Sequence, residues 1–278
     1  MNKVEVKKRL NIILTKLHLL VIFKKIYNFK YVFRHRKHFK EEKKRRNGKN
    51  YNKFIKLKSL ENVYLGKRCF IVATGPSLTV NDVELLSNEY TFGVNSIIKI
   101  FSKTSWRPTF YAIQDSKVYN SFKNDPDFIS INNKFISDYV TEELKIKEEH
   151  IKFPLELFDH MSYGKKGKYD TKFSDNAYAN VYDGSSITYS VMQIAYYMGF
   201  REIYLLGCDC NFSGDKVHFA DCGYSYFSDN PEYRMIFSYN VALNFTKDHD
   251  LKIYNVTRGG KLEVFERKRL EDVLGGEK

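Results

Sequence analysis

The segment from residue 68 to residue 86 constrains the fold most, because it has the pattern of a strand, a turn and a short helix. Its apolar run Cys69-Phe70-Ile71-Val72 predicts a buried strand, and Thr74-Gly75-Pro76-Ser77 predicts a turn. A helical pattern follows over residues 79–86. A helix that starts directly after such a turn presents backbone N–H groups that, with the helix dipole, bind phosphate. We therefore expect a nucleotide or another phosphorylated molecule at this turn.

The rest of the chain repeats this alternation of strands and helices. Further strands are predicted over residues 90–95, 108–114, 133–136, 203–206 and 252–255, and helices over residues 96–102, 138–149, 185–198, 232–249 and 267–274. This order predicts a Rossmann-like α/β fold, with a mostly parallel sheet and helices on both faces. Residues 159–184 lack periodicity, and a loop of that length predicts a lid or a binding loop.

Charge is distributed unevenly along the 278 residues, whose net charge is +13. Residues 1–60 hold 20 Lys and Arg against three acidic residues, a net charge of +17. The remaining residues hold 26 Lys and Arg against 30 acidic residues, a net charge of −4. Because the globular part is mildly acidic, we do not expect a nucleic-acid-binding domain.

The basic N-terminal part is predicted to contain an amphipathic helix over residues 6–33, with Leu10, Leu14 and Leu17 on its apolar stripe. A run dense in Lys and Arg follows. An apolar stripe beside a polybasic segment is typical of a helix that lies on anionic lipid. We therefore expect residues 1–59 to associate with a membrane, with the anionic surface bound through residues 1–58, and residues 60–278 to form a catalytic domain. A helix docked on its own domain and an RNA-binding tail remain alternatives.

Cysteine usage and hydropathy predict where the chain resides. The four cysteines form no regular disulfide framework, which suits a reducing cytoplasm. We expect no signal peptide. The sequence contains no run of about 18 apolar residues, so it predicts no membrane span. The predicted location is therefore cytoplasmic, peripheral on the inner face of the cell membrane. Zinc binding by the set Cys208, Cys210, His218 and Cys222 is a further possibility, but the spacing of these residues is not that of a usual zinc finger.

Small or hydrogen-bonding residues follow five of the predicted strands. In an open α/β sheet ligands bind beyond the carboxyl ends of the strands, so this convergence predicts a binding site. The strand ends are Thr74-Gly75-Pro76-Ser77, Asn95-Ser96, Gln114-Asp115-Ser116, Gly207-Cys208-Asp209 and Asn255-Val256-Thr257.

Several of these side chains have chemistry that suits a nucleotide. Ser77 is expected either to donate its hydroxyl to a phosphate or to cap the following helix. The Asn95 amide suits a base or a ribose. Asp115 and Asp209 could hold Mg²⁺ against a triphosphate, or one of them could act as a general base or bind a ribose hydroxyl. His218 is a candidate acid, base or phosphate donor, with a plain loop residue as the alternative.

The sequence also resembles known families in its motifs. ATGPSL, GVNSI and SSITYSVMQIAYYMGFREIYLLGCD look like the bacterial sialyltransferases of glycosyltransferase family 42. The tail LKIYNVTRGGKLEVFERKRLEDVL is similar to proteins of domain of unknown function 115. That group includes archaeal 6-hydroxymethylpterin diphosphokinases and bacterial surface-polysaccharide and flagellin-modification proteins. The resemblance extends over about residues 66–274.

Resemblance to the sialyltransferases implies inverting transfer from a CMP-activated acidic sugar without a metal. It implies that Gly75 and Ser77 approach the donor phosphate, that Asn95 contacts the nucleotide, and that Ser185 or Ser186 contacts the donor sugar. The turn residue Pro76 and the strand-end residue Gly207 belong to the same motifs.

The chain departs from the sialyltransferase pattern at several positions. Thr74 replaces an Asn of the turn, and the position of the family's general-base His falls near Arg234. The two tyrosines that hold the leaving phosphate fall near Asn211 and Val217. We therefore expect His218 and Arg234 to stabilise the leaving phosphate, with the general base unassigned.

These observations favour a glycosyltransferase that transfers a sialic-acid-like sugar to a lipid-linked, capsular or lipopolysaccharide acceptor. The alternatives are a Mg-ATP-dependent diphosphokinase of the 6-hydroxymethylpterin type and a non-catalytic polysaccharide-assembly protein. No cofactor is expected for the glycosyltransferase, and Mg²⁺ is expected only for the diphosphokinase. The predicted catalytic residues are His218, Asp209 and Arg234. The predicted donor-binding residues are Thr74, Gly75, Pro76, Ser77, Asn95, Asp115, Ser185, Ser186 and Gly207.

Overall fold

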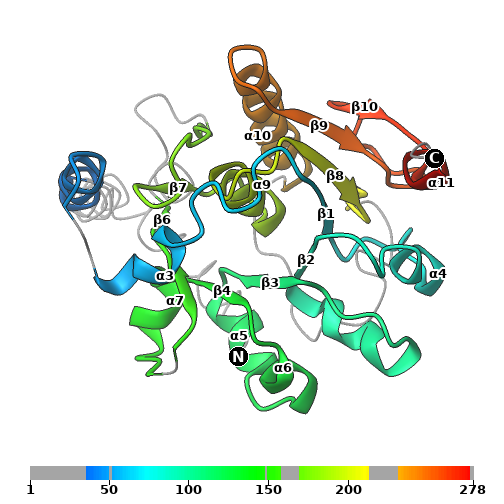
Figure 1. The fold of residues 1–278 in the computed structure, drawn as a ribbon, viewed down its shortest axis with the longest axis horizontal. Coiled ribbons are helices and arrows are strands. Elements are labelled where there is room, and N and C mark those ends of the chain that lie inside the picture. Colours follow the sequence, from blue (N-terminus) through cyan, green and yellow to red (C-terminus); the bar gives the residue numbers. More distant parts are fainter. Residues whose placement is uncertain (1–35, 50–51, 148, 158–168, 213–230, 276–278) are drawn as a thin grey trace, which may run out of the picture.

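A single parallel sheet forms the centre of the protein. The computed structural model describes residues 36–49, 52–147, 149–157, 169–212 and 231–275. The eight strands lie in the order β10-β9-β8-β1-β2-β3-β4-β5, and every neighbouring pair is parallel (Figure 1). This arrangement confirms the Rossmann-like α/β fold. The strands are β1 (Arg68–Val72), β2 (Thr91–Val94), β3 (Phe110–Ile113), β4 (Lys134–Ser137), β5 (Ile151–Phe153), β8 (Glu202–Leu206), β9 (Lys252–Asn255) and β10 (Glu266–Arg267).

The strand order reverses between β1 and β8. From β1 the chain runs outward through β2 to β5, and it then returns across the sheet to form β8, β9 and β10 on the other side. Ile71 of β1 pairs with Phe92 on one side and with Leu205 on the other. In open α/β sheets the connections diverge at such a reversal and leave a crevice beyond the strand ends, so this is where a ligand is expected.

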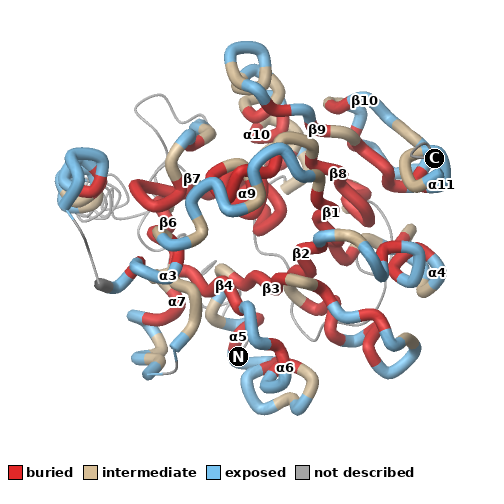
Figure 2. The backbone as a smooth tube through the Cα atoms, viewed as in Figure 1, coloured by how far each residue is buried: buried red, intermediate tan, exposed pale blue. Residues whose placement is uncertain are grey.

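The sheet separates two hydrophobic cores, because alternate residues of each strand point to opposite faces. In β1, Cys69 and Ile71 belong to one core, and Phe70 and Val72 belong to the other. The first core is covered by η1 (Asn52–Phe54), α3 (Ile55–Lys58), α9 (Ile187–Tyr197) and α10 (Pro231–Thr246). The second is covered by α4 (Val80–Glu84), η2 (Asn95–Lys103), α5 (Ser116–Phe122), α6 (Pro126–Ser130), α7 (Asp138–Glu143) and α11 (Leu270–Gly275). Figure 2 shows the central strands as almost continuously buried.

The loop expected over residues 159–184 is partly a packed element. Residues 158–168 lie outside the described residues. Ala177 and Ala179 are fully buried, and β7 (Val181–Tyr182) pairs with β6 (Leu155–Glu156) in a second, two-stranded sheet. The part that the structure describes, residues 169–184, is therefore a support of the first core and not an open lid.

The packed body begins before residue 60, where the sequence had suggested a boundary. Phe54 and Leu57 are buried in the first core, so residues 52–58 fold with the sheet and not with a separate segment. A further helix covers residues 36–46 at one end of the molecule (Figure 1). The predicted helix over residues 6–33 lies outside the described residues. Among the described helices, none has the length and apolar character needed to cross a bilayer.

Candidate functional site

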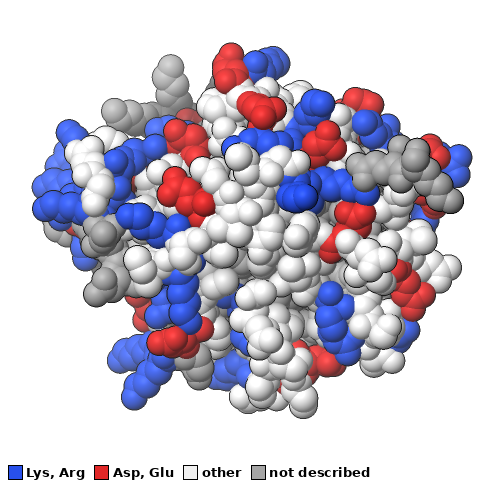
Figure 3. Space-filling model, in the orientation of Figure 1, with Lys and Arg blue, Asp and Glu red and all other residues white. Residues whose placement is uncertain are grey.

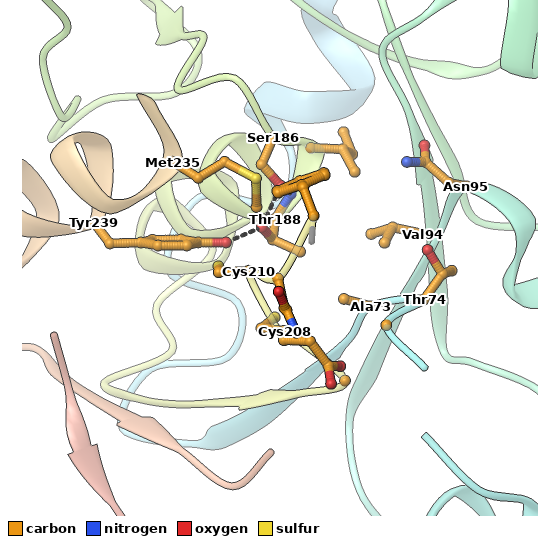
Figure 4. Close-up of a pocket in the computed structure, with 16 residues that line it drawn as sticks. Ala73, Thr74, Val94, Asn95, Ser186, Thr188, Cys208, Cys210, Met235 and Tyr239 are labelled. Atoms are coloured by element: carbon orange, nitrogen blue, oxygen red, sulfur yellow. Dashed lines mark hydrogen bonds between the residues drawn. The ribbon is translucent and has the colours of Figure 1, made fainter. Parts of the chain in front are cut away.

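A pocket lies at the carboxyl ends of β1 and β8, at the reversal of strand order. The space between its walls is about 500 Å³, part of it open to solvent. Figure 4 shows Tyr239 and Met235 on one side and Thr74, Val94 and Asn95 on the other. The remaining lining residues are Ala73, Gly75, Ser186, Ile187, Thr188, Gly207, Cys208, Asp209, Cys210, Asn211 and Phe212. Three predicted strand ends, those of β1, β2 and β8, therefore meet here.

The turn after β1 is held against the turn after β8. The Gly75 N–H donates to the Gly207 carbonyl at 2.8 Å, and the Ala73 N–H donates to the Leu206 carbonyl at 2.8 Å. A Cβ on Gly75 would lie 2.5 Å from the Gly207 oxygen and 2.7 Å from Asp209 Cγ. Gly207 has a φ of 68°, which favours glycine. Glycine at position 75 therefore serves the close approach of two protein segments.

The carboxylate of Asp209 occupies the position that the sequence had assigned to a phosphate. It accepts hydrogen bonds from the Ser77 hydroxyl, at 2.8 Å, and from the Ser77 N–H. Burial raises the pKa of Asp209 above its usual range, although the hydrogen bonds from Ser77 lower it. In the free protein a protein carboxylate thus takes the Ser77 donors.

The helix that follows this turn has its own N-terminal cap. α4 spans Val80–Glu84, and its first amides are capped by Thr79 and Asp82 in a capping box. The Leu78 N–H donates to the Gly75 carbonyl at 3.2 Å. Ser77 therefore does not cap α4. Phosphate binding at this turn stays a prediction.

Asn95 lines the pocket in a strained backbone conformation. Its φ is 50°, and its carbonyl accepts a hydrogen bond from the buried Tyr111 hydroxyl. Ser185 and Cys210, at the same edge of the sheet, also have positive φ angles of 61° and 50°. Positive φ costs free energy in non-glycine residues, and such residues cluster at functional sites. Asn95 and Cys210 line the pocket, and Ser185 directly precedes its lining residue Ser186.

A chain of three hydroxyl groups forms one wall of the pocket. Ser186 caps the N-terminus of α9, and its hydroxyl lies 2.6 Å from that of Thr188 (Figure 4). The Thr188 hydroxyl also bonds to that of Tyr239, which reaches it from α10. Burial raises the pKa of Tyr239 well above its usual range, so its hydroxyl stays protonated. This wall presents groups that can donate and accept hydrogen bonds without carrying charge.

Arg234 lies next to the pocket, one residue before Met235. Its guanidinium carbon lies 5.4 Å from the ring centroid of Tyr169, over the ring. The Tyr169 hydroxyl in turn lies 2.8 Å from the Ser238 hydroxyl and bonds to Ser185. Burial raises the pKa of Tyr169 to about 12. Within the described part of the chain, Arg234 forms no ion pair with a carboxylate.

Among the predicted site residues that the structure describes, five do not line the pocket, namely Pro76, Ser77, Asp115, Ser185 and Arg234. The carboxylate of Asp115 caps α5, accepting from the Lys117 N–H at 2.8 Å and the Val118 N–H at 3.1 Å. His218 lies outside the described residues, as does Cys222 of the zinc alternative. Among the described residues, no group of three or more His, Cys, Asp or Glu side chains could hold a metal ion.

The ends of β3 and β9 support the pocket without lining it. Gln114 donates to the buried carboxylate of Asp183 at 2.8 Å and accepts from the Ser190 hydroxyl at 2.6 Å. The Thr257 hydroxyl accepts a hydrogen bond from the Cys208 N–H at 2.9 Å. These two strand ends therefore fix α9 and the turn after β8.

Sequence reasoning missed several residues of the site, namely Thr188, Asn211, Met235 and Tyr239. Met235 and Tyr239 lie four residues apart on α10, so both fall on one face of the helix. That spacing predicts a core face, and nothing in one sequence shows that part of the face borders a pocket. Cys208 and Cys210 also line it, and burial raises the pKa of both thiols.

Comparisons with known proteins place the chain in a family. No curated protein matches it. The solved glycosyltransferase MAf from Magnetospirillum magneticum AMB-1 is similar over 79% of this chain, with 15% sequence identity and a TM-score of 0.47. The chain covers 38% of the length of that protein. A family model described as 6-hydroxymethylpterin diphosphokinase MptE-like matches residues 45–215, more than half of the chain. The chain therefore belongs to the MptE-like family.

Proposed function

We propose that this protein is a glycosyltransferase that binds a nucleotide-activated sugar in the pocket between β1 and β8. The favoured donor is a CMP-activated acidic sugar, and the proposed acceptor is a lipid-linked, capsular or lipopolysaccharide glycan. The observation that carries the proposal is the composition of the pocket. One carboxylate, two side-chain amides and three linked hydroxyl groups converge at the reversal of strand order, and such groups suit a ligand rich in hydroxyl groups.

The position of Asp209 gives the bound donor a direction. A phosphate next to this buried carboxylate would bring two negative charges together at low dielectric, which is unfavourable. We therefore assign the region around Thr74, Asn95 and Asp209 to neutral, hydroxyl-bearing parts of the donor. The phosphate is assigned to the side of the pocket near Arg234, whose positive charge has no carboxylate partner among the described residues.

In this scheme the transfer is a displacement at the anomeric carbon. An acceptor hydroxyl forms the new C–O bond while the bond from carbon to the phosphate oxygen breaks, and the nucleotide phosphate leaves with the electron pair. A general base takes the acceptor proton, and donors or cations stabilise the leaving group. Asp209 is the proposed base, because burial raises its pKa toward the range where a carboxylate accepts a proton effectively. Arg234 and His218 are the proposed partners of the leaving phosphate.

The family description favours a second candidate, a Mg-ATP-dependent diphosphokinase. That reading used Asp115 and Asp209 as a pair of magnesium ligands. Asp115 does not line the pocket, and its Oδ1 accepts hydrogen bonds from two amides of α5, so the pair is not assembled around the pocket. A diphosphokinase of this chain would therefore have to recruit a different second ligand.

Ligand-induced thermal stabilisation separates these candidates. We expect CMP or a CMP-sugar to raise the melting temperature without Mg²⁺, and to do so more than UDP, GDP or ATP. Thr188→Val keeps the side-chain shape but removes one wall hydroxyl, and it should weaken binding about fivefold, the equivalent of one hydrogen bond. Thr141→Val is the matched control, because Thr141 is also buried but lies on α7 and bonds only to the Asp138 carbonyl at 3.1 Å among the contacts seen.

Other outcomes point elsewhere. An ATP effect that requires Mg²⁺ would favour the diphosphokinase, and the absence of any nucleotide effect would favour a non-catalytic assembly protein. Release of CMP from a CMP-sugar in the presence of a lipid extract then tests transfer itself. A failure of the wild type to consume any nucleotide-sugar under these conditions would contradict the proposed function.

A further inference from the structure

The helix over residues 36–46 separates its charged side chains into two faces. At about 100° per residue, Arg36, Lys37, Lys40, Lys43 and Lys44 fall within an arc of about 120°. All five are exposed. His38, Glu42 and Arg45 fall on the opposite side, and Glu42 and Arg45 are buried. Figure 3 shows blue side chains gathered at the end of the molecule where this helix lies.

Specific contacts fix which face points outward. The Arg45 Nε–H donates to the Ala179 carbonyl at 2.8 Å, and His38 Nε2 lies 2.6 Å from the Asn180 side-chain oxygen. Arg46 donates to Asp175 at 2.9 Å. The helix is thus bound through its inner face to the packed segment before β7. Its outer face is held away from the domain in one orientation.

The outer cations are largely available to an external partner. Lys44 forms an ion pair with Glu41 at 2.6 Å. Arg36, Lys37, Lys40 and Lys43 form no ion pair with any residue in the described ranges. Phe39 lies at the border of this face and is 57% exposed. We define the basic face as Arg36, Lys37, Lys40 and Lys43, with Phe39 beside it.

We propose that the basic face docks the protein on an anionic lipid bilayer. Lys and Arg side chains bind the negative surface of a membrane, and an aromatic side chain at the border of the basic face can enter the interface. Two further observations favour a bilayer over a nucleic acid. The sequence before this helix carries apolar residues at helical spacing. Residues 61–278 have a net charge of −4, so the rest of the chain has no excess of positive charge to attract a phosphate backbone.

This inference does not depend on the proposed transferase activity. It assigns the contact to a helix that is fixed on the domain, and it therefore predicts that the domain rests on the membrane in one orientation. Each cation near an anionic leaflet raises partitioning about fivefold. Removal of four should lower vesicle binding on the order of several hundred-fold.

The test uses the full chain and vesicles of phosphatidylglycerol or phosphatidylcholine in a sedimentation assay. The face variant carries Arg36→Gln, Lys37→Gln, Lys40→Gln and Lys43→Gln. The control variant loses the same charge from exposed lysines elsewhere, through Lys103→Gln, Lys123→Gln, Lys147→Gln and Lys252→Gln. We expect the wild type and the control variant to sediment with phosphatidylglycerol vesicles only, and the face variant to stay in the supernatant.

Three results would overturn the inference. The wild type could fail to sediment with anionic vesicles, the face variant could bind like the wild type, or both variants could lose binding equally. Retention on single-stranded RNA without vesicle binding would instead assign the basic face to nucleic acid. Melting temperatures of all proteins, with and without nucleotide, show whether the variants fold. A protein that binds vesicles but no nucleotide would uphold this inference while contradicting the proposed function.

Discussion

Replacement of Gly75 by alanine tests how the turns after β1 and β8 are joined. A Cβ at this position would lie 2.5 Å from the Gly207 carbonyl oxygen, about 0.9 Å inside ordinary van der Waals contact, which begins at 3.4 Å. It would also lie 2.7 Å from Asp209 Cγ. The Gly207 oxygen cannot yield easily, because the Gly75 N–H already binds it at 2.8 Å. Both the strand ends and the carboxylate must therefore move.

The cost follows from these displacements. Forcing a methyl group into a packed site costs about 1 to 3 kcal/mol. If the Asp209 carboxylate turns away, it also loses the hydrogen bonds from Ser77, and a bond to a charged group contributes about 1.5 to 3 kcal/mol. We expect Gly75→Ala to lower the free energy of unfolding by about 3 to 5 kcal/mol. For a chain of this size the melting temperature should fall by roughly 6 °C or more.

Urea denaturation and thermal melting measure this loss, and Gly275→Ala is the control, because a Cβ there meets nothing within 4 Å. The double variant with Asp209→Ala separates the two obstacles. Without the carboxylate, only the Gly207 carbonyl opposes the methyl group. The loss of unfolding free energy caused by Gly75→Ala should therefore shrink by roughly 1 kcal/mol or more, which is the coupling energy between positions 75 and 209. An equal cost in both backgrounds would refute the reasoning that Asp209 closes this turn, and a wild-type stability of Gly75→Ala would refute the close approach itself.

Two further predictions concern the acidic residues. Asp115→Ala should cost about 1 kcal/mol of stability through the lost cap of α5 and leave nucleotide affinity unchanged; a loss of affinity in a ligand-titrated thermal melt would return Asp115 to the site. For Asp209, the raised pKa means that the folded state holds the carboxyl proton more tightly than the unfolded state does. The wild type therefore loses stability as pH rises from the ordinary carboxyl pKa of about 3.9 to the raised pKa of the folded state. The stability of Asp209→Asn relative to the wild type should therefore increase over that interval and then level off in urea unfolding, and a flat or falling difference would contradict the burial of a charged carboxylate.

The parallel sheet was readable from the sequence because its strands are apolar and separated by helical patterns. The strands predicted at residues 90–95, 203–206 and 252–255 correspond to β2, β8 and β9. Short elements were not readable. β5 has only three residues and was not predicted, and the helix predicted over residues 138–149 ends early, at Glu143.

Local capping signals could have found two of the missed helices. Asp115 precedes α5, and Asp125 precedes α6, which has Pro126 in its first turn. Asp115 follows a strand, and for that reason it was interpreted as a candidate ligand of Mg²⁺ or of a ribose. An aspartate in that position serves equally well as a helix cap, and only the direction of its carboxylate in the structure decides between the two roles.

A pocket lies at the strand ends where the sequence predicted a site, but the residues of its interior were not predicted. Strand ends can be read locally, since each is a property of one segment. The hydroxyl chain of Ser186, Thr188 and Tyr239 joins residues more than 50 positions apart, and no local pattern shows that α9 and α10 present these groups to each other. The same limit explains why the Ser77 donors were assigned to a phosphate, since their partner Asp209 is 132 residues away.

The contact between Asp209 and Ser77 changes what the turn after β1 does. A turn with vacant donors would attract any phosphate, and selectivity would have to come from elsewhere. Here a buried carboxylate already satisfies those donors, so an incoming anion must either displace it or avoid it. Displacement would leave Asp209 buried without its two hydrogen bonds, which is costly. A ligand that instead offers a hydroxyl group to the carboxylate keeps the Ser77 contact intact and adds a bond. Under the proposed function, this arrangement would select for the hydroxyl-bearing end of a ligand at this end of the pocket and would place its charged end toward Arg234.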